Sequence, residues 1–184
     1  MRSTTKHFIS AFIFVVFGSF LFASGLENRN AIGVYIIGSE NPVGGIQYER
    51  RFSDLISEKF GIYAMYNPDS YSTQPFDFNF TAETDFKLYE TTWKGWISSR
   101  LFAYVLAGYD VYIKREYSYD DEYNHISSDS KDEIVNNVIL SAGFGFDFIF
   151  FDHLSIPIEF GFMGTFPNEP HIGFCGGISV RYGW

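Results

Sequence analysis

The 184-residue sequence has little cysteine, little positive charge and, beyond its first segment, no long apolar run. Its single cysteine, Cys175, excludes an internal disulfide framework and a zinc site with four cysteine ligands. Lys and Arg number 13 against 22 Asp and Glu, so the formal net charge is -9. This balance argues against a nucleic-acid partner, because phosphate binding needs a basic surface.

The one long uncharged run lies at the N-terminus. Basic residues precede the stretch over residues 8–23, and small residues follow it. This pattern predicts a secretory signal peptide with a helical core over residues 1–25, leaving a mature domain over residues 26–184. An uncleaved membrane anchor is the alternative, but the run is short for a span of about 20 residues.

The remaining chain is rich in aromatic residues and alternates with a period of two. Aromatic residues make up 21% of the sequence, 22 of them Phe. In residues 138–150, 154–163 and 172–184 almost every second residue is Phe, Ile, Leu or Val, and the residues between are mostly Gly, Ser or charged. Such alternation predicts strands with one apolar and one small or polar face.

The composition of the two faces indicates which one points inward. A soluble sandwich exposes a face rich in Lys, Thr and Glu, but here the second face is rich in Gly and Ser with isolated charges. The pattern favours a barrel whose outside meets lipid and whose narrow inside holds small and paired polar side chains. A secreted soluble β-barrel that binds a small apolar ligand is the alternative.

The whole chain divides into eight predicted strands, which makes the predicted fold all-β: an eight-stranded antiparallel up-and-down transmembrane β-barrel. Short turns follow the second, fourth and sixth strands, and long loops over residues 67–86 and 117–133 follow the third and fifth, as in outer-membrane barrels. We expect a bulge at Pro157, which cannot donate a ladder hydrogen bond. The predicted strands cover about residues 31–38, 43–52, 60–66, 87–98, 103–116, 138–150, 154–163 and 172–184.

Three segments carry a family resemblance: "YVLAGYDVY", the hairpin "GFGFDFIFFDHLSIPIEFGF" with its acidic Glu159, and the C-terminus "GGISVRYGW". Over about residues 30–184 the chain resembles the small eight-stranded outer-membrane β-barrel proteins described as the outer membrane protein beta-barrel domain. The resemblance implies a bacterial outer-membrane location. It also implies that the tail is the signal read by the barrel-insertion machinery, with Trp184 replacing the usual Phe. The tail positions are Ile178, Val180, Tyr182 and Trp184.

Nine charged residues fall on predicted inward positions. An eight-stranded barrel is only wide enough inside for side chains, which argues against a wide diffusion pore. Both signs of charge are present, and buried charges persist when they are paired and hydrogen-bonded. We therefore expect structural pairing in the lumen and no acid–base catalysis. The nine are Glu49, Arg51, Glu90, Lys94, Asp110, Lys114, Asp147, Glu159 and Arg181.

One set of residues is similar to a catalytic site. His153, Ser155 and Glu159 resemble the His/Ser/Glu set of lipid A deacylase barrels, but His153 is predicted at the periplasmic end, whereas the site of that family faces the outer leaflet. A lipid A-modifying enzyme is thus an alternative to the favoured non-enzymatic barrel. The histidines lack metal-ligand spacing, and the Gly-rich stretches resemble no phosphate loop. We expect no catalytic, cofactor or metal site.

The loop over residues 117–133 contains six acidic residues and one Lys. Its charge suits divalent cations or a cell-surface partner, and the alternative is that it is simply solvated. The expected partners are outer-membrane lipid, the insertion machinery and an unknown surface ligand contacting the loops over residues 67–86 and 117–133. We expect a monomer with an envelope-structural or surface-interaction role.

Overall fold

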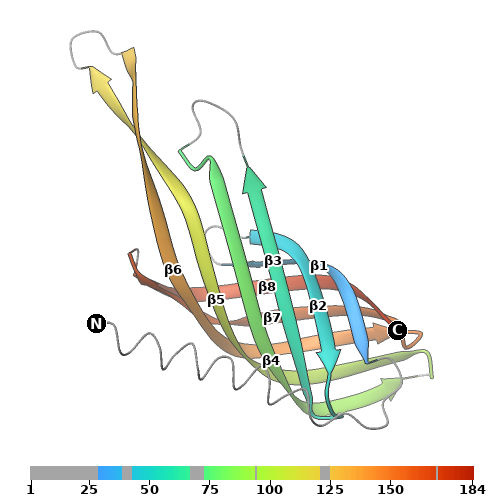
Figure 1. The fold of residues 1–184 in the computed structure, drawn as a ribbon. Helices are drawn as coiled ribbons and strands as arrows, with labels where there is room; N and C mark the ends of the chain where they lie inside the picture. Colours follow the sequence, from blue (N-terminus) through green and yellow to red (C-terminus); the bar gives the residue numbers. More distant parts are fainter. Residues whose placement is uncertain (1–28, 39–42, 67–72, 94, 121–124, 169) are drawn as a thin grey trace.

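The computed structural model describes residues 29–38, 43–66, 73–93, 95–120, 125–168 and 170–184 as a closed barrel of eight antiparallel strands (Figure 1). Each strand pairs with the next along the chain, and β8 closes the ring against β1. The predicted all-β, eight-stranded antiparallel barrel is confirmed. The strands are β1 Asn30–Gly38, β2 Val43–Arg51, β3 Ile56–Tyr66, β4 Phe76–Trp93, β5 Ile97–Asp120, β6 His125–Phe150, β7 Leu154–Pro167 and β8 His171–Gly183.

The signal peptide predicted over residues 1–25 is not among the described residues. No helix in the described part of the chain is long and apolar enough to cross a membrane.

The distribution of side chains is the reverse of that in a soluble protein. Along β7, Ser155 and Glu159 are buried in the lumen, whereas Ile158 and Phe162 are exposed on the outer wall. The same alternation follows the other strands, because successive side chains of a strand point to opposite faces. Apolar residues also fill part of the interior, in a cluster of Tyr35, Ile37, Phe102, Tyr104, Leu106 and Ile139.

Two predicted boundaries around β4 are wrong. The predicted loop over residues 67–86 is strand from Phe76 onward, and the predicted strand over residues 87–98 runs across the β4–β5 turn. That turn contains Gly95 with φ +72°, a conformation that favours glycine. The lumenal side chains of β4 are polar, so this strand has the composition of a loop although its residues alternate.

The predicted loop over residues 117–133 is also mostly strand. β4 begins its pairing with β5 at Ile113, and β7 ends its pairing with β6 at Asn137. Above these points β5 and β6 continue together as a two-stranded ribbon, which rises past the other strands in Figure 1. The connection between β5 and β6 is therefore short, and the long connection is the one between β3 and β4.

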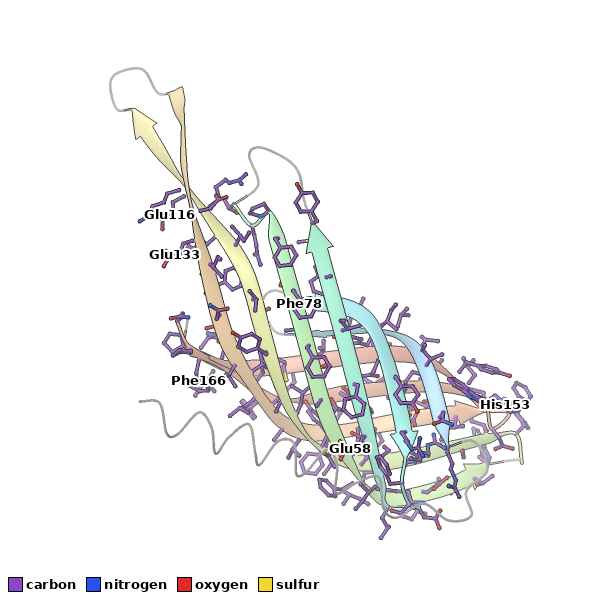
Figure 2. All side chains as sticks on the ribbon, viewed as in Figure 1. Glu58, Phe78, Glu116, Glu133, His153 and Phe166 are labelled. Carbon is purple, nitrogen blue, oxygen red and sulfur yellow. The ribbon has the colours of Figure 1, made fainter. Side chains whose placement is uncertain are left out.

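The ribbon pairs opposite charges across its two strands. Lys114 lies opposite Glu133, and the next position pairs Arg115 with Asp132 through hydrogen bonds of 2.7 and 2.9 Å. Opposite charges facing each other across antiparallel strands stabilise the pairing. The Arg115 guanidinium also lowers the pKa of Asp132 below its ordinary value. Figure 2 shows Glu133 on this ribbon and His153 at the opposite end of the barrel.

The bulge expected at Pro157 is absent. The β6–β7 register runs without a shift through the pair Asp147–Pro157, and the β7–β8 pairing omits Pro157 and resumes in register. The missing N–H therefore removes a ladder bond without inserting a residue. Register shifts occur instead in β4 between Lys87 and Tyr89 and in β5 between Tyr117 and Tyr119.

Candidate functional site: the charged interior

The first ionic cluster of the lumen is centred on Lys59 of β3, whose side chain is fully buried. Its Nζ lies 2.6 Å from Glu83 Oε1, 2.8 Å from Asp85 Oδ2 and 2.5 Å from Glu159 Oε1. The ammonium also lies 4.6 Å from the centre of the Phe102 ring. Three carboxylates from β4 and β7 thus converge on one ammonium, which links opposite walls of the barrel.

The second cluster is centred on Arg181 of β8, also fully buried. Its Nη1 lies 3.0 Å from Glu49 Oε2, and its Nη2 lies 3.8 Å from Asp147 Oδ2. Ser155 Oγ accepts a bond from Arg181 at 3.4 Å and donates one to Asp147 at 2.6 Å. Gln47 Oε1 also accepts from Arg181 at 3.5 Å. These contacts tie β2, β6, β7 and β8 together through one guanidinium.

The nine residues predicted to line the lumen divide into four groups. Glu49, Asp147, Glu159 and Arg181 are buried in the two clusters, and Arg51 and Asp110 are half-buried. Lys94 is not among the described residues.

Glu90 and Lys114 are exposed, because they lie at the two ends of the barrel. Glu90 is directly opposite Arg100 at the turn end, where its carboxylate binds Lys87 Nζ at 2.6 Å and lines the inner face of the barrel mouth. Lys114 lies at the base of the ribbon, beyond the ends of β4 and β7, so no neighbouring strand covers its side chain.

Three central residues were missed from the predicted set. Lys59, Glu83 and Asp85 occupy the middle of the Lys59 cluster, but the predicted strand boundaries place them in a turn and a loop. The alternation of "FDFNFTAETDF" over residues 76–86 carries the signal that identifies the β4 pair. Lys59 then follows as the inward residue opposite Glu83.

Glycines make room for these bulky interior groups. A Cβ at Gly145 would collide with the ring of Phe102, and a Cβ at Gly33 would collide with the carbonyl oxygen of Val180 and with the Cα and Cγ of Arg181. The small residues that alternate with the apolar ones therefore leave space for large side chains from neighbouring strands. The lumen is filled by this interlocking.

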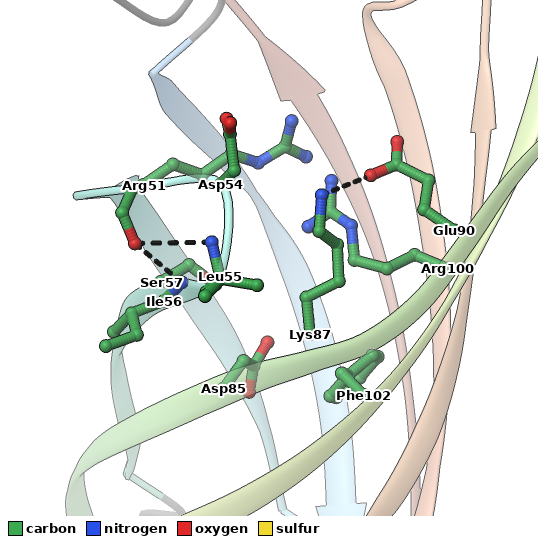
Figure 3. A pocket seen from close by; sticks show the side chains of 11 residues that line it. Arg51, Asp54, Leu55, Ile56, Ser57, Asp85, Lys87, Glu90, Arg100 and Phe102 are labelled. Atoms are coloured by element: carbon green, nitrogen blue, oxygen red, sulfur yellow. Dashed lines mark hydrogen bonds and ion pairs between the residues drawn. The ribbon is translucent and has the colours of Figure 1, made fainter. Parts of the chain in front are cut away.

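A small pocket of about 120 Å³ opens at the turn end of the barrel, near Arg51, Lys87 and Arg100 (Figure 3). All three cations are paired: Arg51 Nε lies 3.3 Å from Glu49 Oε1, and Lys87 binds Glu90. Arg100 reaches to within 4.0 Å of Asp147. The pocket is thus bordered by ion pairs that continue the interior network.

The three residues that resemble a hydrolase set have separate partners. His153 Nδ1 lies 2.9 Å from the carbonyl oxygen of Gly183, at the turn end. Ser155 donates to Asp147, and Glu159 binds Lys59. Among the described residues, no group of three or more His, Cys, Asp or Glu side chains is placed to hold a metal ion.

The outer wall carries an apolar band with aromatic residues gathered at the turn end. Trp96 stacks on Phe151 with ring centres 5.6 Å apart, and Tyr182 stacks on His153 at 5.5 Å. Aromatic side chains of this kind are enriched at membrane–water interfaces. The four tail residues Ile178, Val180, Tyr182 and Trp184 are all exposed on this wall, and Cys175 is buried inside.

Known structures share this architecture. The N-terminal β-barrel domain of OprF from Pseudomonas aeruginosa matches with a TM-score of 0.51 at 11% identity, over 86% of this chain and 98% of that chain. The solution structure of outer membrane protein H (OprH) from P. aeruginosa, in DHPC micelles, matches with a TM-score of 0.51 at 10% identity, over 85% of this chain and 99% of that one. The chain has the fold of small outer-membrane β-barrels. No protein-family model and no curated protein matches it.

Proposed function

We propose that this chain is an integral, non-enzymatic protein of the bacterial outer membrane. The observation that carries the proposal is the reversed distribution of side chains: Lys59 and Arg181 are fully buried inside, whereas large apolar residues such as Phe162 and Phe174 are exposed outside. Exposed apolar surface on this scale is unfavourable in water but favourable against lipid. A closed barrel also satisfies the backbone hydrogen bonds that lipid cannot.

The test is the location and gel behaviour of the protein in a Gram-negative host. We expect it in the outer-membrane fraction, with unboiled samples migrating differently from boiled ones on SDS gels. Recovery as a soluble periplasmic protein would refute the proposal and favour the secreted β-barrel that binds a small apolar ligand. The charged interior argues against that second function, because Lys59, Arg181 and their carboxylate partners occupy the lumen.

We further propose that the ribbon end faces the outside of the cell. The short turns near Gly95 and His153 and the C-terminal Trp184 share the other end, as expected for the periplasmic side. A tag inserted between β5 and β6 should be labelled on intact cells, and a matched tag between β6 and β7 only after permeabilisation. The reverse pattern would refute this orientation.

The surface role we propose is structural support of the envelope or interaction with a partner through the ribbon and the β3–β4 connection. The ribbon and this connection take the place of the two surface loops predicted over residues 67–86 and 117–133. The chain is proposed to act as a monomer, which light scattering of the detergent-solubilised barrel tests directly. A stable dimer in several detergents would contradict it.

The non-enzymatic part of the proposal is tested with lipid A. The lumenal binding of Glu159 to Lys59 and the contact of His153 with the Gly183 carbonyl support a structural use of these side chains. Cells that carry His153→Ala or Ser155→Ala should have the same lipid A composition as cells with the native chain. A change in lipid A acylation would favour the deacylase alternative.

The tail is proposed to be the signal for the barrel-insertion machinery. Its outward residues end in Trp184, whose backbone pairs with Asn30 of β1. Trp184→Phe should insert as well as the native chain, whereas removal of Trp184 should lower the yield of heat-modifiable protein in the outer membrane. Equal yields for all three would refute the assignment.

A further inference from the structure

The inner face of β4 near the ribbon end has buried oxygen atoms without hydrogen-bond partners. Asp77 is 7% exposed and Asn79 is 1% exposed, yet Asp77 Oδ1 and Asn79 Oδ1 have no partner among the described residues. Leaving a buried polar atom unsatisfied costs about 1–3 kcal/mol. Oxygens of this kind call for a partner that protein groups do not supply.

A second carboxyl group lies beside them on the neighbouring strand. Asp110 of β5 is directly opposite Asn79, and its carboxyl group lies close enough to that of Asp77 to interact with it electrostatically. Gln74 Nε2 donates to the other oxygen of Asp77 at 3.2 Å. Two carboxyl groups and an amide oxygen therefore meet on adjacent inward positions of two paired strands.

The charge around this group differs from that in the rest of the lumen. Glu83 and Asp85, further along the same face of β4, converge on Lys59. For Asp77 no ion pair with a cation is found within the part of the chain that the structure describes. Two carboxyl groups this close cannot both ionise without cost unless a proton or a metal cation lies between them.

We propose that Asp77, Asn79 and Asp110 form a binding site for a divalent cation, with calcium the best fit. Calcium binds carboxylate and amide oxygens and tolerates irregular coordination, whereas magnesium demands near-ideal octahedral geometry. The site combines two carboxylates with one amide oxygen, a donor set that spacing rules for histidine and cysteine do not detect. Tyr63 of β3, directly opposite Asn79, provides an aromatic group beside it.

The position gives the site a structural consequence. Asp77 and Asp110 belong to the two strands that form the tall wall of the barrel, just below the ribbon. A cation held there joins β4 and β5 where the ring of strands is about to open, and it neutralises the repulsion between two acidic side chains. Binding should therefore stabilise the barrel at its ribbon end.

Terbium luminescence tests the site in the full-length barrel refolded in detergent. Terbium substitutes for calcium, and its emission under tyrosine excitation requires a nearby ring such as Tyr63. We expect saturable emission that calcium displaces. Asp77→Asn and Asp110→Asn should each weaken binding at least about tenfold, because the number of charged ligands tunes calcium affinity over decades. The matched control is Asp132→Asn, an exposed carboxylate on the ribbon, which should bind like the native chain.

Asn79→Asp makes the test decisive. It adds a third carboxylate, so it should tighten binding of terbium and calcium, a gain that a purely structural asparagine does not predict. Heat-modifiable migration verifies that each variant is folded. Absence of saturable emission from the native chain, or equal binding by Asp77→Asn and the native chain, overturns the proposal and leaves the pair sharing only a proton. If Asp77→Asn fails to fold, the native chain and Asn79→Asp decide the question.

Discussion

Removal of the buried ammonium of Lys59 should be one of the most damaging single changes in the barrel. Lys59→Met has nearly the same length as lysine but leaves Glu83, Asp85 and Glu159 facing one another without their shared cation. Breaking a buried ion pair by removing one partner costs about 3–5 kcal/mol, because the remaining charge is uncompensated. We expect the free energy of unfolding to fall by about this amount.

Neutralising one of the acidic partners of Lys59 should destabilise the barrel much less. Glu83→Gln keeps an oxygen that accepts from Lys59 and replaces one of the three carboxyl groups around a single ammonium by a neutral amide. Its cost should be small, and it should partly rescue Lys59→Met when the two are combined. This asymmetry separates an electrostatic role of Lys59 from a role as filler of the lumen.

Urea unfolding of the barrel in lipid vesicles, followed by tryptophan fluorescence, measures these differences. The control is Arg115→Met, which breaks the exposed pair with Asp132, and such exposed pairs contribute little to stability. If Lys59→Met and Arg115→Met destabilise the barrel to the same small extent, the reasoning about the buried cluster is refuted. A Glu83→Gln variant as unstable as Lys59→Met would refute it equally.

Three further predictions concern the wall, the lumen packing and the ribbon. Phe162, 66% exposed on the outer wall, should tolerate Ala better than Arg in the same vesicle assay. Arg on the lipid face of a barrel costs up to about 2–4 kcal/mol, depending on depth, and equal costs for the two variants would contradict a lipid-facing position. Gly145→Ala places a methyl group against the ring of Phe102 and should cost about 1–3 kcal/mol through overpacking, and an unchanged unfolding midpoint would show that the space is free. Arg115→Gln should raise the pKa of Asp132 toward its ordinary value, read by NMR titration of the carboxyl carbon. Because that pKa is lowered in the folded ribbon, the pair stabilises the ribbon above the ordinary pKa of Asp132, and this contribution is lost as the pH falls; a carboxyl titration that is identical in both proteins would disprove the pairing.

The regular C-terminal strands were predictable because their two faces differ in composition at most positions. β7 alternates Ile158 and Phe160 outward with Glu159 and Gly161 inward, so the composition of each face is visible in the sequence. The first part of β4 is wrongly predicted as a loop because its inward residues are acidic and amide side chains, which are equally typical of loops. Whether such a segment is a strand or a loop depends on the side chains that neighbouring strands place beside it, and the local composition does not contain that information.

The same limit applies to the ionic clusters. Inward positions such as Glu49 and Arg181 follow from alternation, but their partnership does not, because β2 and β8 are far apart in the chain and meet only through β1. Lys59 and Glu159 are separated by 100 residues and are brought together by the narrow lumen. The sequence by itself determined that strands with one apolar face form an eight-stranded barrel, because period-two patterning follows directly from strand geometry. Only the tertiary structure decided which carboxylates meet which cation, where the tall ribbon begins and which oxygens on β4 lack a partner, because register and ring closure bring these groups together.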